Sequence, residues 1–348
     1  MSLPLKLPYP PMEALSVSEV PTRGEWQYEP KWDGFRCLAF RDGAKVELQS
    51  KAGLPLGRYF PELVRAMLDL RPKKFVLDGE IVIPINGHLS FDDLLMRIHP
   101  AASRVKKLSE ETPALLVLFD CLVDENGKPL VERPLKERRN KLENFVRRYA
   151  PKNGTVRLSP ATEKVSETHR WLKVGASLDG IIAKRQDARY ESGQRTGAIQ
   201  KIKKLRAADC VVGGFRYAVK KRVVGSLLLG LYDKHNLLNH VGFTSSIHNA
   251  DRAQLTRKLE ALIRPPGFTG QAPGGPGRWS TRRSTEWEPL ASKLVVEVQY
   301  DHFTGGRFRH GTKFLRWRPD KAPRQCTMAQ VAQESRTPLP MLQAHEQR

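Results

Sequence analysis

The first 205 residues alternate between two patterns of apolar and polar positions. Short apolar runs bounded by turn residues are typical of buried strands. These runs predict strands at Phe35–Phe40, Val76–Pro84, Leu115–Leu122 and Leu178–Lys184. Stretches with helical spacing between them predict helices at Tyr59–Leu70, Phe91–Ile98, Pro134–Tyr149 and Val165–Gly175. Strands and helices mixed in this way predict a large α+β domain.

The pattern changes after Lys204, where strands dominate. The apolar runs predict strands at Cys210–Tyr217, Ser226–Tyr232, Asn239–Thr244 and Leu294–Tyr300. One helix is expected at Asp251–Ile263, and the Gly/Pro-rich stretch Pro265–Arg283 is typical of a surface loop. Several strands with one helix are typical of a small OB-type barrel, a common nucleic-acid scaffold. We therefore predict an α+β domain at 1–205, an OB-fold β-barrel at 206–330 and a flexible tail at 331–348.

The charge of the chain points to a polyanionic partner. The 348 residues include 59 Lys and Arg against 37 Asp and Glu, which gives a net charge of +22. Contacts from Lys and Arg to phosphate dominate nucleic-acid affinity, so this charge favours a nucleic-acid partner. The alternative explanation is a basic surface that keeps the protein soluble. Residues 206–348 hold 23 of the basic and 11 of the acidic side chains, so the excess is densest there. No five consecutive cations occur, which indicates charge on folded surfaces.

Several classes of protein are excluded by composition. No apolar run approaches the roughly 18 residues that span a bilayer, and the proline-rich N-terminus does not resemble a signal peptide. The four cysteines are scattered without a CxxC pair, so they predict neither a disulfide framework nor a zinc module. We therefore expect a cytoplasmic protein in a reducing compartment.

The segment Glu29–Arg36, EPKWDGFR, carries the most informative chemistry. A lysine, Asp-Gly and an arginine entering a strand form a compact turn that is loaded with charge. The amine of Lys31 is nucleophilic only when it is deprotonated, which neighbouring cations or desolvation can bring about. A surface hairpin with ordinary charges explains the pattern equally well when it is viewed alone.

Four further segments lie at strand ends and carry charged or aromatic residues. Viewed singly, each is as well explained by a charged turn, a core aromatic or a solvated strand edge. Alternation along a strand places residues 180, 182 and 184 on one face, and Lys201 and Lys203 on one face of the next. The segments are Val76–Glu80 (VLDGE), Leu116–Asp120 (LVLFD), Leu178–Lys184 (LDGIIAK) and Gln200–Lys204 (QKIKK).

In this order the five segments resemble the motifs of the covalent nucleotidyltransferase superfamily, which includes ATP-dependent DNA ligases, RNA ligases and mRNA capping enzymes. A sixth motif, R-x-D-K, matches Arg318–Lys321. The resemblance covers about residues 25–327 and is closest to bacterial DNA ligase C and the ligase module of ligase D. It implies a nucleotidyltransferase (adenylation) domain followed by an OB-fold domain, and ATP with Mg²⁺ or Mn²⁺ as cofactors.

The resemblance also assigns roles to individual residues. Lys31 matches the nucleophile that becomes lysyl-AMP. Glu80 and Asp179 match metal-binding acids, a role that suits hard oxygen ligands. The remaining matches bind the nucleotide: Glu29 and Pro30 (adenine recognition), Arg36 (phosphate or ribose), Glu80 (ribose), Phe119 (adenine stacking), Lys184, Lys201 and Lys203 (α-phosphate), and Arg318, Asp320 and Lys321 (pyrophosphate).

Two positions depart from the family pattern. Asp179 stands where many relatives have Glu, and the shorter side chain changes its reach to a metal. Lys51, in Ser50–Gly53, stands where ligases have an arginine in a Ser-Arg-x-Gly element. Lysine keeps the charge but lacks the bidentate fork, so we assign Lys51 as a weaker DNA contact.

The resemblance implies an enzyme that seals nicks in double-stranded DNA and takes part in DNA repair and recombination. ATP adenylates Lys31, AMP passes to the 5′-phosphate, and the 3′-hydroxyl then attacks. We expect a monomer that acts in the bacterial nucleoid, with repair proteins as further partners and no membrane association. The alternatives are an RNA ligase or RNA capping-type nucleotidyltransferase, and a non-catalytic nucleic-acid-binding protein.

Overall fold

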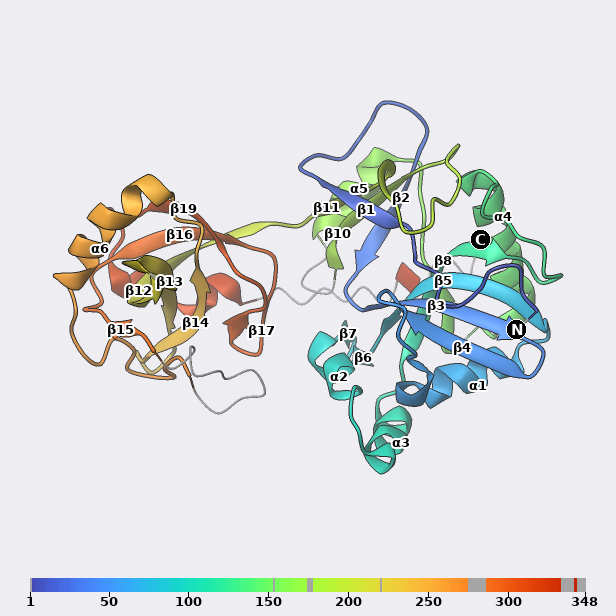
Figure 1. The fold of residues 1–348 in the computed structure, drawn as a ribbon, viewed down its shortest axis with the longest axis horizontal. Coiled ribbons are helices and arrows are strands. Elements are labelled where there is room, and N and C mark those ends of the chain that lie inside the picture. The colour runs from blue at the N-terminus through green and yellow to red at the C-terminus, as the bar shows by residue number, and fades with distance from the viewer. Residues whose placement is uncertain are drawn as a thin grey trace. The chain divides into compact units, whose positions relative to one another are not determined.

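The computed structural model describes residues 2–152, 154–173, 178–219, 221–274, 286–332 and 341–342. They form two compact units (Figure 1). The N-terminal unit extends to Lys204 and also includes Met341 and Leu342, and the C-terminal unit begins at Leu205. Most of the predicted tail, 331–348, and part of the predicted loop at Pro265–Arg283 lie outside the described residues.

A five-stranded sheet forms the centre of the N-terminal unit. Its order is β4 (Lys45–Ser50), β3 (Phe35–Asp42), β5 (Lys74–Val82), β8 (Leu115–Val123) and β9 (Val156–Leu158). Helices α1 (Pro61–Asp69) and α4 (Leu135–Tyr149) bury apolar side chains on one face of this sheet. Phe145 of α4 meets Phe75 of β5 edge to face, with ring centres 5.1 Å apart. Strands β3, β5 and β8 and helices α1 and α4 confirm predicted elements, with ends shifted by up to a few residues, whereas the sequence did not predict β4 and β9.

A second sheet lies against the other face of the first. Its order is β1 (Glu13–Val17), β11 (Arg195–Lys203), β10 (Leu178–Arg185) and β2 (Trp26–Trp32). Helix α5 (Val165–Lys173) covers its outer side, where Trp171 packs with Tyr28 and Ile181. On the inner side, Ile182 and Ile199 pack in one cluster with buried residues of β3. The two sheets therefore enclose the space between them.

The unit is completed by short elements around the sheets. They are the 3₁₀ helix η1 (Gly57–Tyr59), strands β6 (Pro84–Ile85) and β7 (His88–Leu89), and helices α2 (Phe91–Met96) and α3 (Ala102–Glu111). The side chain of Ser90 caps α2 by accepting a hydrogen bond from the backbone N–H of Asp93 at 3.2 Å.

The turn that carries Lys31 is not a hairpin. Lys31 is the penultimate residue of β2, and β3 begins three residues after β2 ends but belongs to the other sheet. The sequence did not predict β2 because Trp26–Trp32 contains Pro30, and proline argues against a strand since it cannot donate a hydrogen bond to the neighbouring strand. The proline is tolerated because β2 is an edge strand.

The C-terminal unit is a barrel of the OB type. Its strand order is β14 (Leu238–Thr244), β13 (Lys221–Tyr232), β12 (Arg206–Ala218), β16 (Val295–Tyr300) and β19 (Lys313–Trp317). Thr244, at the end of β14, forms a bridge with Thr312, which directly precedes β19. This contact brings the two edges of the sheet together. Helix α6 (Arg252–Glu260), 3₁₀ helices η2 (Asn249–Asp251), η3 (Pro323–Gln325) and η4 (Met328–Val331), and strands β15 (Glu288–Pro289), β17 (Phe303–Thr304) and β18 (Arg307–Phe308) complete it.

Two further expectations concern cysteines and membranes. All four cysteines are free and buried. No helix in the described part of the chain combines the length and apolarity of a membrane span.

Candidate active site

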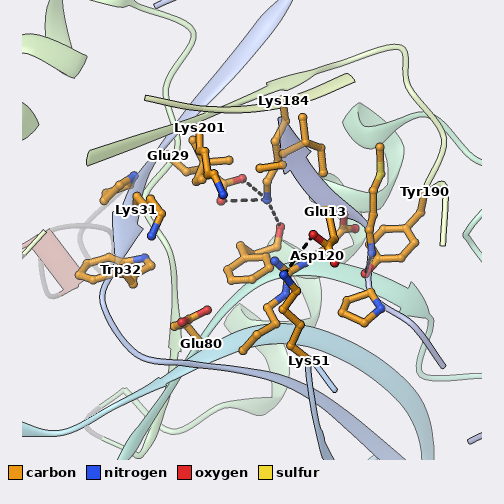
Figure 2. Close-up of a pocket in the computed structure, with 18 residues that line it drawn as sticks. Glu13, Glu29, Lys31, Trp32, Lys51, Glu80, Asp120, Lys184, Tyr190 and Lys201 are labelled. Atoms are coloured by element: carbon orange, nitrogen blue, oxygen red, sulfur yellow. Dashed lines mark hydrogen bonds and ion pairs between the residues drawn. The ribbon is translucent and has the colours of Figure 1, made fainter. Parts of the chain in front are cut away.

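A pocket opens between the two sheets of the N-terminal unit (Figure 2). Strands of both sheets contribute its walls, so residues far apart in the sequence meet there. Most of the residues assigned from the sequence line it: Glu29, Pro30, Lys31, Arg36, Lys51, Glu80, Phe119, Lys184 and Lys201.

The strand register places the charged residues of the second sheet in rows. Lys31 of β2 lies opposite Gly180 of β10, and Gly180 lies opposite Lys203 of β11. Glu29 and Lys201 flank Ile182 in the same way two residues further along. Since side chains alternate along a strand, Lys31, Glu29, Lys201 and Lys203 share one face of the sheet.

Glycine is required in the row that carries Lys31. Gly180 has φ +139°, and a Cβ there would lie 2.0 Å from the carbonyl oxygen of Ile202. A Cβ on Gly34 would likewise lie 2.2 Å from the carbonyl oxygen of Ile81. Gly34 and Gly180 therefore each allow a close approach between neighbouring backbones.

Lys31 forms an ion pair with Asp179, the acid before Gly180. The side chain of Asp179 is 8% exposed and that of Lys31 is 22% exposed, so the amine faces the pocket while its carboxylate partner lies deeper. A deprotonated amine must form before Lys31 can act as a nucleophile, and this pair has to loosen when it does.

Lys184 lies between Lys31 on one side of the pocket and Tyr190 on the other (Figure 2). Its ammonium is 2.8 Å from Oε1 of Glu29 and 4.5 Å from the centre of the Phe119 ring. Glu29 also accepts a hydrogen bond from the amide of Gln27 at 2.7 Å. The structure thus joins Glu29, Phe119 and Lys184, whereas the sequence grouped Lys184 with the phosphate-binding lysines.

Arg36 is held by a buried carboxylate that the sequence did not assign. Its Nε and Nη2 donate to the two oxygens of Asp78, each at 2.6 Å, and its guanidinium carbon lies 4.6 Å from the Phe119 ring centre. Burial alone would lower the pKa of Arg36, but the charge and hydrogen bonds of Asp78 raise it. The hydroxyl of Tyr190 donates to Asp78 at 2.7 Å and accepts from the backbone N–H of Met12 at 3.1 Å.

Glu80 differs from the other acids of the pocket. Burial raises its pKa to about 7, although the charges of Arg36 and Lys31 partly oppose this shift. Among the described residues no hydrogen bond or ion pair reaches its carboxylate. A cation bound beside it would favour the charged form, which makes Glu80 suited to a hard metal ion. The described residues contain no cluster of three or more metal-ligating side chains.

The lysines at the mouth of the pocket are less buried. Desolvation lowers the pKa of Lys201, and the charges of Lys31 and Lys203 lower it further. Lys51, 57% exposed, lies 3.1 Å from a carboxylate oxygen of Glu13, which Arg195 also contacts. Its side chain is therefore near solvent, and its assignment as a DNA contact stays a prediction.

Asp78 and Tyr190, which form the hydrogen-bond network around Arg36, carry no clear signal in the sequence. Asp78 belongs to the D-G-E segment, in which only Glu80 matches a residue with a family role. Tyr190 lies in a loop after β10, and no pattern marks it. Asp120, of the F-D segment, lines the pocket and forms a buried pair with Arg138 of α4 at 2.8 Å.

The R-x-D-K motif lies in the C-terminal unit, directly after β19. Arg318 and Lys321 each lie 2.8 Å from a carboxylate oxygen of Asp209, and Arg318 also pairs with Asp320. Asp209 is the fourth residue of β12 and belongs to the same unit.

Comparisons with known proteins agree with these motifs. The sequence model of the ATP dependent DNA ligase domain matches residues 11–203, and that of the ATP dependent DNA ligase C terminal region matches residues 220–321. The chain is 43% identical to DNA ligase C2 of Mycolicibacterium smegmatis and 40% identical to DNA ligase C of Mycobacterium tuberculosis. Each match covers 95% of this chain and 96% of the relative. A solved structure from a study of Lig E DNA ligases has a TM-score of 0.55 at 17% identity, covering 88% of this chain and 99% of that one, which shows a shared fold.

Proposed function

The chain belongs to the family of ATP-dependent DNA ligases, and from this premise we propose the roles of its own residues in sealing a nick. The observation that carries the proposal is the pocket itself. It brings Lys31, Glu29, Phe119 and Glu80 together from three strands of two sheets. A nucleophilic amine, an aromatic face and charged groups for ribose and phosphate are the parts that adenylation needs.

In the first step the deprotonated amine of Lys31 attacks the α-phosphorus of ATP. A P–N bond forms, the bond to the bridging oxygen breaks, pyrophosphate leaves, and the nitrogen releases one proton to solvent. In the second step the 5′-phosphate oxygen at the nick displaces Lys31 and takes up AMP. In the third step the 3′-hydroxyl attacks that phosphate, loses its proton and releases AMP.

The other residues bind and orient the nucleotide. Arg36, fixed by Asp78, would present its remaining N–H groups to ribose or phosphate oxygens. Lys201 and Lys203 would supply positive charge for the α-phosphate. Glu80 and Asp179 would hold Mg²⁺ or Mn²⁺, and the metal would neutralise phosphate charge.

The test of Lys31 is label transfer from α-radiolabelled ATP to the protein in the presence of Mg²⁺. We expect the wild type and Lys45→Ala, a change at an exposed lysine of β4, to become labelled, and Lys31→Ala to remain unlabelled. Label on Lys31→Ala would show that a different residue is the nucleophile.

Nicked duplex DNA is the substrate that family membership supports best. The alternative, activity on RNA ends, is separated by offering nicked DNA and RNA ends to the labelled enzyme. The net charge of +22 supports contacts to phosphate, so nick binding should weaken steeply with salt. Binding that stays flat in salt would contradict backbone contacts.

We also propose a cytoplasmic monomer that acts in DNA repair and recombination, with repair proteins as partners. Four free cysteines support a reducing compartment. A role in repair is supported by similarity to the multifunctional non-homologous end joining DNA repair protein LigD of Mycobacterium tuberculosis, which is 28% identical over 37% of its length.

A further inference from the structure

Asp209 is a buried carboxylate that contacts both cations of the R-x-D-K motif. Its Oδ1 accepts from Nη1 of Arg318 and its Oδ2 accepts from Nζ of Lys321, both at 2.8 Å. It lies 109 residues before Arg318 in the sequence, so no motif pattern connects them. All three residues belong to the C-terminal unit.

The position of Asp209 is fixed by its own backbone. Its N–H donates to the side-chain oxygen of Gln330, and its carbonyl accepts from the side-chain nitrogen of Gln330, both at 3.1 Å. On its other side β12 pairs with β16, where Asp209 lies opposite Glu297. Asp209 therefore lies within a paired strand of the barrel, whereas Arg318 and Lys321 lie in the segment that follows β19.

Asp209 leaves both cations with hydrogen-bond capacity. A guanidinium has five N–H donors and an ammonium has three. Arg318 donates its Nε–H and one Nη2–H to Asp320, and one Nη1–H to Asp209. Among the described residues, Lys321 donates one hydrogen bond, to Asp209. Each cation keeps two donors, which suits an anion with several oxygens.

We propose that Asp209 is a positioning residue, which aligns Arg318 and Lys321 for the pyrophosphate leaving group in the first step. The proposal rests on the proposed function. A long cationic side chain loses rotamer freedom when it binds phosphate, and Asp209 has already restricted both chains. The charges of Asp209 and Asp320 balance those of Arg318 and Lys321, so the cluster offers aligned donors rather than excess charge.

The test is the variant Asp209→Asn, which keeps the shape of the side chain and removes its charge. Two rates are measured: formation of lysyl-AMP from ATP, and sealing of a nick that already carries AMP on its 5′-phosphate. Misplaced groups cost up to about 100-fold, so we expect lysyl-AMP formation to fall by roughly 10- to 100-fold. Sealing of the adenylated nick should change by less than about 2-fold, because pyrophosphate takes no part in it.

The matched control is Glu297→Gln, on the neighbouring strand. Glu297 pairs with Arg316 at 2.6 Å, and Arg316 lies outside the R-x-D-K motif. This variant should show no selective loss of lysyl-AMP formation. Asp209→Glu keeps the charge but moves it by one methylene, and it should show an intermediate loss that is again confined to the first step.

A double-mutant comparison separates positioning from a merely structural role. Because Lys321 is one of the two cations that Asp209 contacts, Asp209→Asn should cost less lysyl-AMP formation in a Lys321→Met background than in the wild type. Additive losses, equal losses in both reactions, or faster lysyl-AMP formation by Asp209→Asn would overturn the proposal. Failure of the wild type to form lysyl-AMP would instead contradict the proposed function.

Discussion

Lys184 and Glu29 form an ion pair of 2.8 Å in which the side chains are only 6% and 2% exposed. The pair lies against the ring of Phe119, which has the guanidinium of Arg36 4.6 Å from its centre as well. Glu29 and Phe119, two of the three residues that the resemblance assigns to adenine, therefore have a buried cation between them. This arrangement indicates that Lys184 helps shape the part of the pocket that we propose to bind adenine, while its action on the α-phosphate stays a prediction.

Replacing Lys184 with Met should destabilise the N-terminal unit strongly. The change leaves the Glu29 carboxylate buried without its cation, and breaking a buried pair costs about 3–5 kcal/mol. Urea denaturation followed by tryptophan fluorescence measures this loss. Glu29→Gln combined with Lys184→Met should recover part of it because no charge is left unpaired. A double variant as unstable as the sum of the two single variants would contradict the coupling.

Replacing Gly180 with Ala should impair the site through the backbone. The new Cβ would clash with the carbonyl of Ile202 and would also occupy a φ that side chains rarely adopt, a strain of about 1–3 kcal/mol before the clash. β10 must shift, and Lys31 must move with the paired strand, so lysyl-AMP formation should fall at least about 10-fold.

The control for this change is Gly197→Ala on β11, where the nearest atom to a new Cβ is the side-chain nitrogen of Gln200 at 4.0 Å. It should retain stability and labelling. Equal behaviour of the two alanine variants would show that the close approach at Gly180 is unimportant.

Tyr190→Phe should weaken ATP binding without abolishing chemistry. The change removes the hydrogen bond to Asp78 and leaves Arg36 less firmly held, at a cost of about 1–3 kcal/mol for a buried group. We expect a higher KM for ATP in lysyl-AMP formation. Tyr28→Phe also removes a hydroxyl bond, of 2.6 Å to the carbonyl of Pro21, but does not touch Arg36. If both variants raise KM equally, the link through Asp78 is refuted.

Stability should fall below pH 6.5 through His240 in the C-terminal unit. Burial, followed by the charges of Arg307 and Arg216, lowers the pKa of this histidine to about 3. The unfolded chain takes up a proton as the pH falls from about 6.5, while the folded chain does so only near pH 3. Stability is therefore fully present above pH 6.5 and is lost progressively toward pH 3, by about 2 kcal/mol between pH 7 and pH 5.

Urea denaturation at pH 7 and pH 5 checks this pH dependence, with His240→Gln compared with the wild type. The variant should lose less stability on acidification. His235→Gln, a change at an exposed histidine, should behave like the wild type. An unchanged pH dependence in His240→Gln would mean that other groups cause the acid loss.

Much of the architecture could be predicted because the buried strands are continuous apolar runs. Leu115–Val123 is buried almost throughout and was predicted almost to its ends. Strand β2 was missed because its residues alternate irregularly and include Pro30, and only pairing with β10 makes it a strand. Local pattern does not contain that information.

The same limit applies to the site. Ordered motifs identified the residues around the pocket, since their types and sequence order match the family. Tyr190 and Asp209 could not be found in this way, because each acts through a partner more than 100 residues away in the chain. Such contacts depend on how strands of different regions come together.

The rows across β2, β10 and β11 also determine where the chain can change length. Inserting or deleting one residue inside any of these strands would turn every later side chain to the opposite face. Lys31 would then leave the pocket, or Lys201 and Lys203 would exchange places with the apolar residues behind them. Changes in length among relatives should therefore fall in the connecting loops, while the spacings from Glu29 to Lys31 and from Lys201 to Lys203 stay constant.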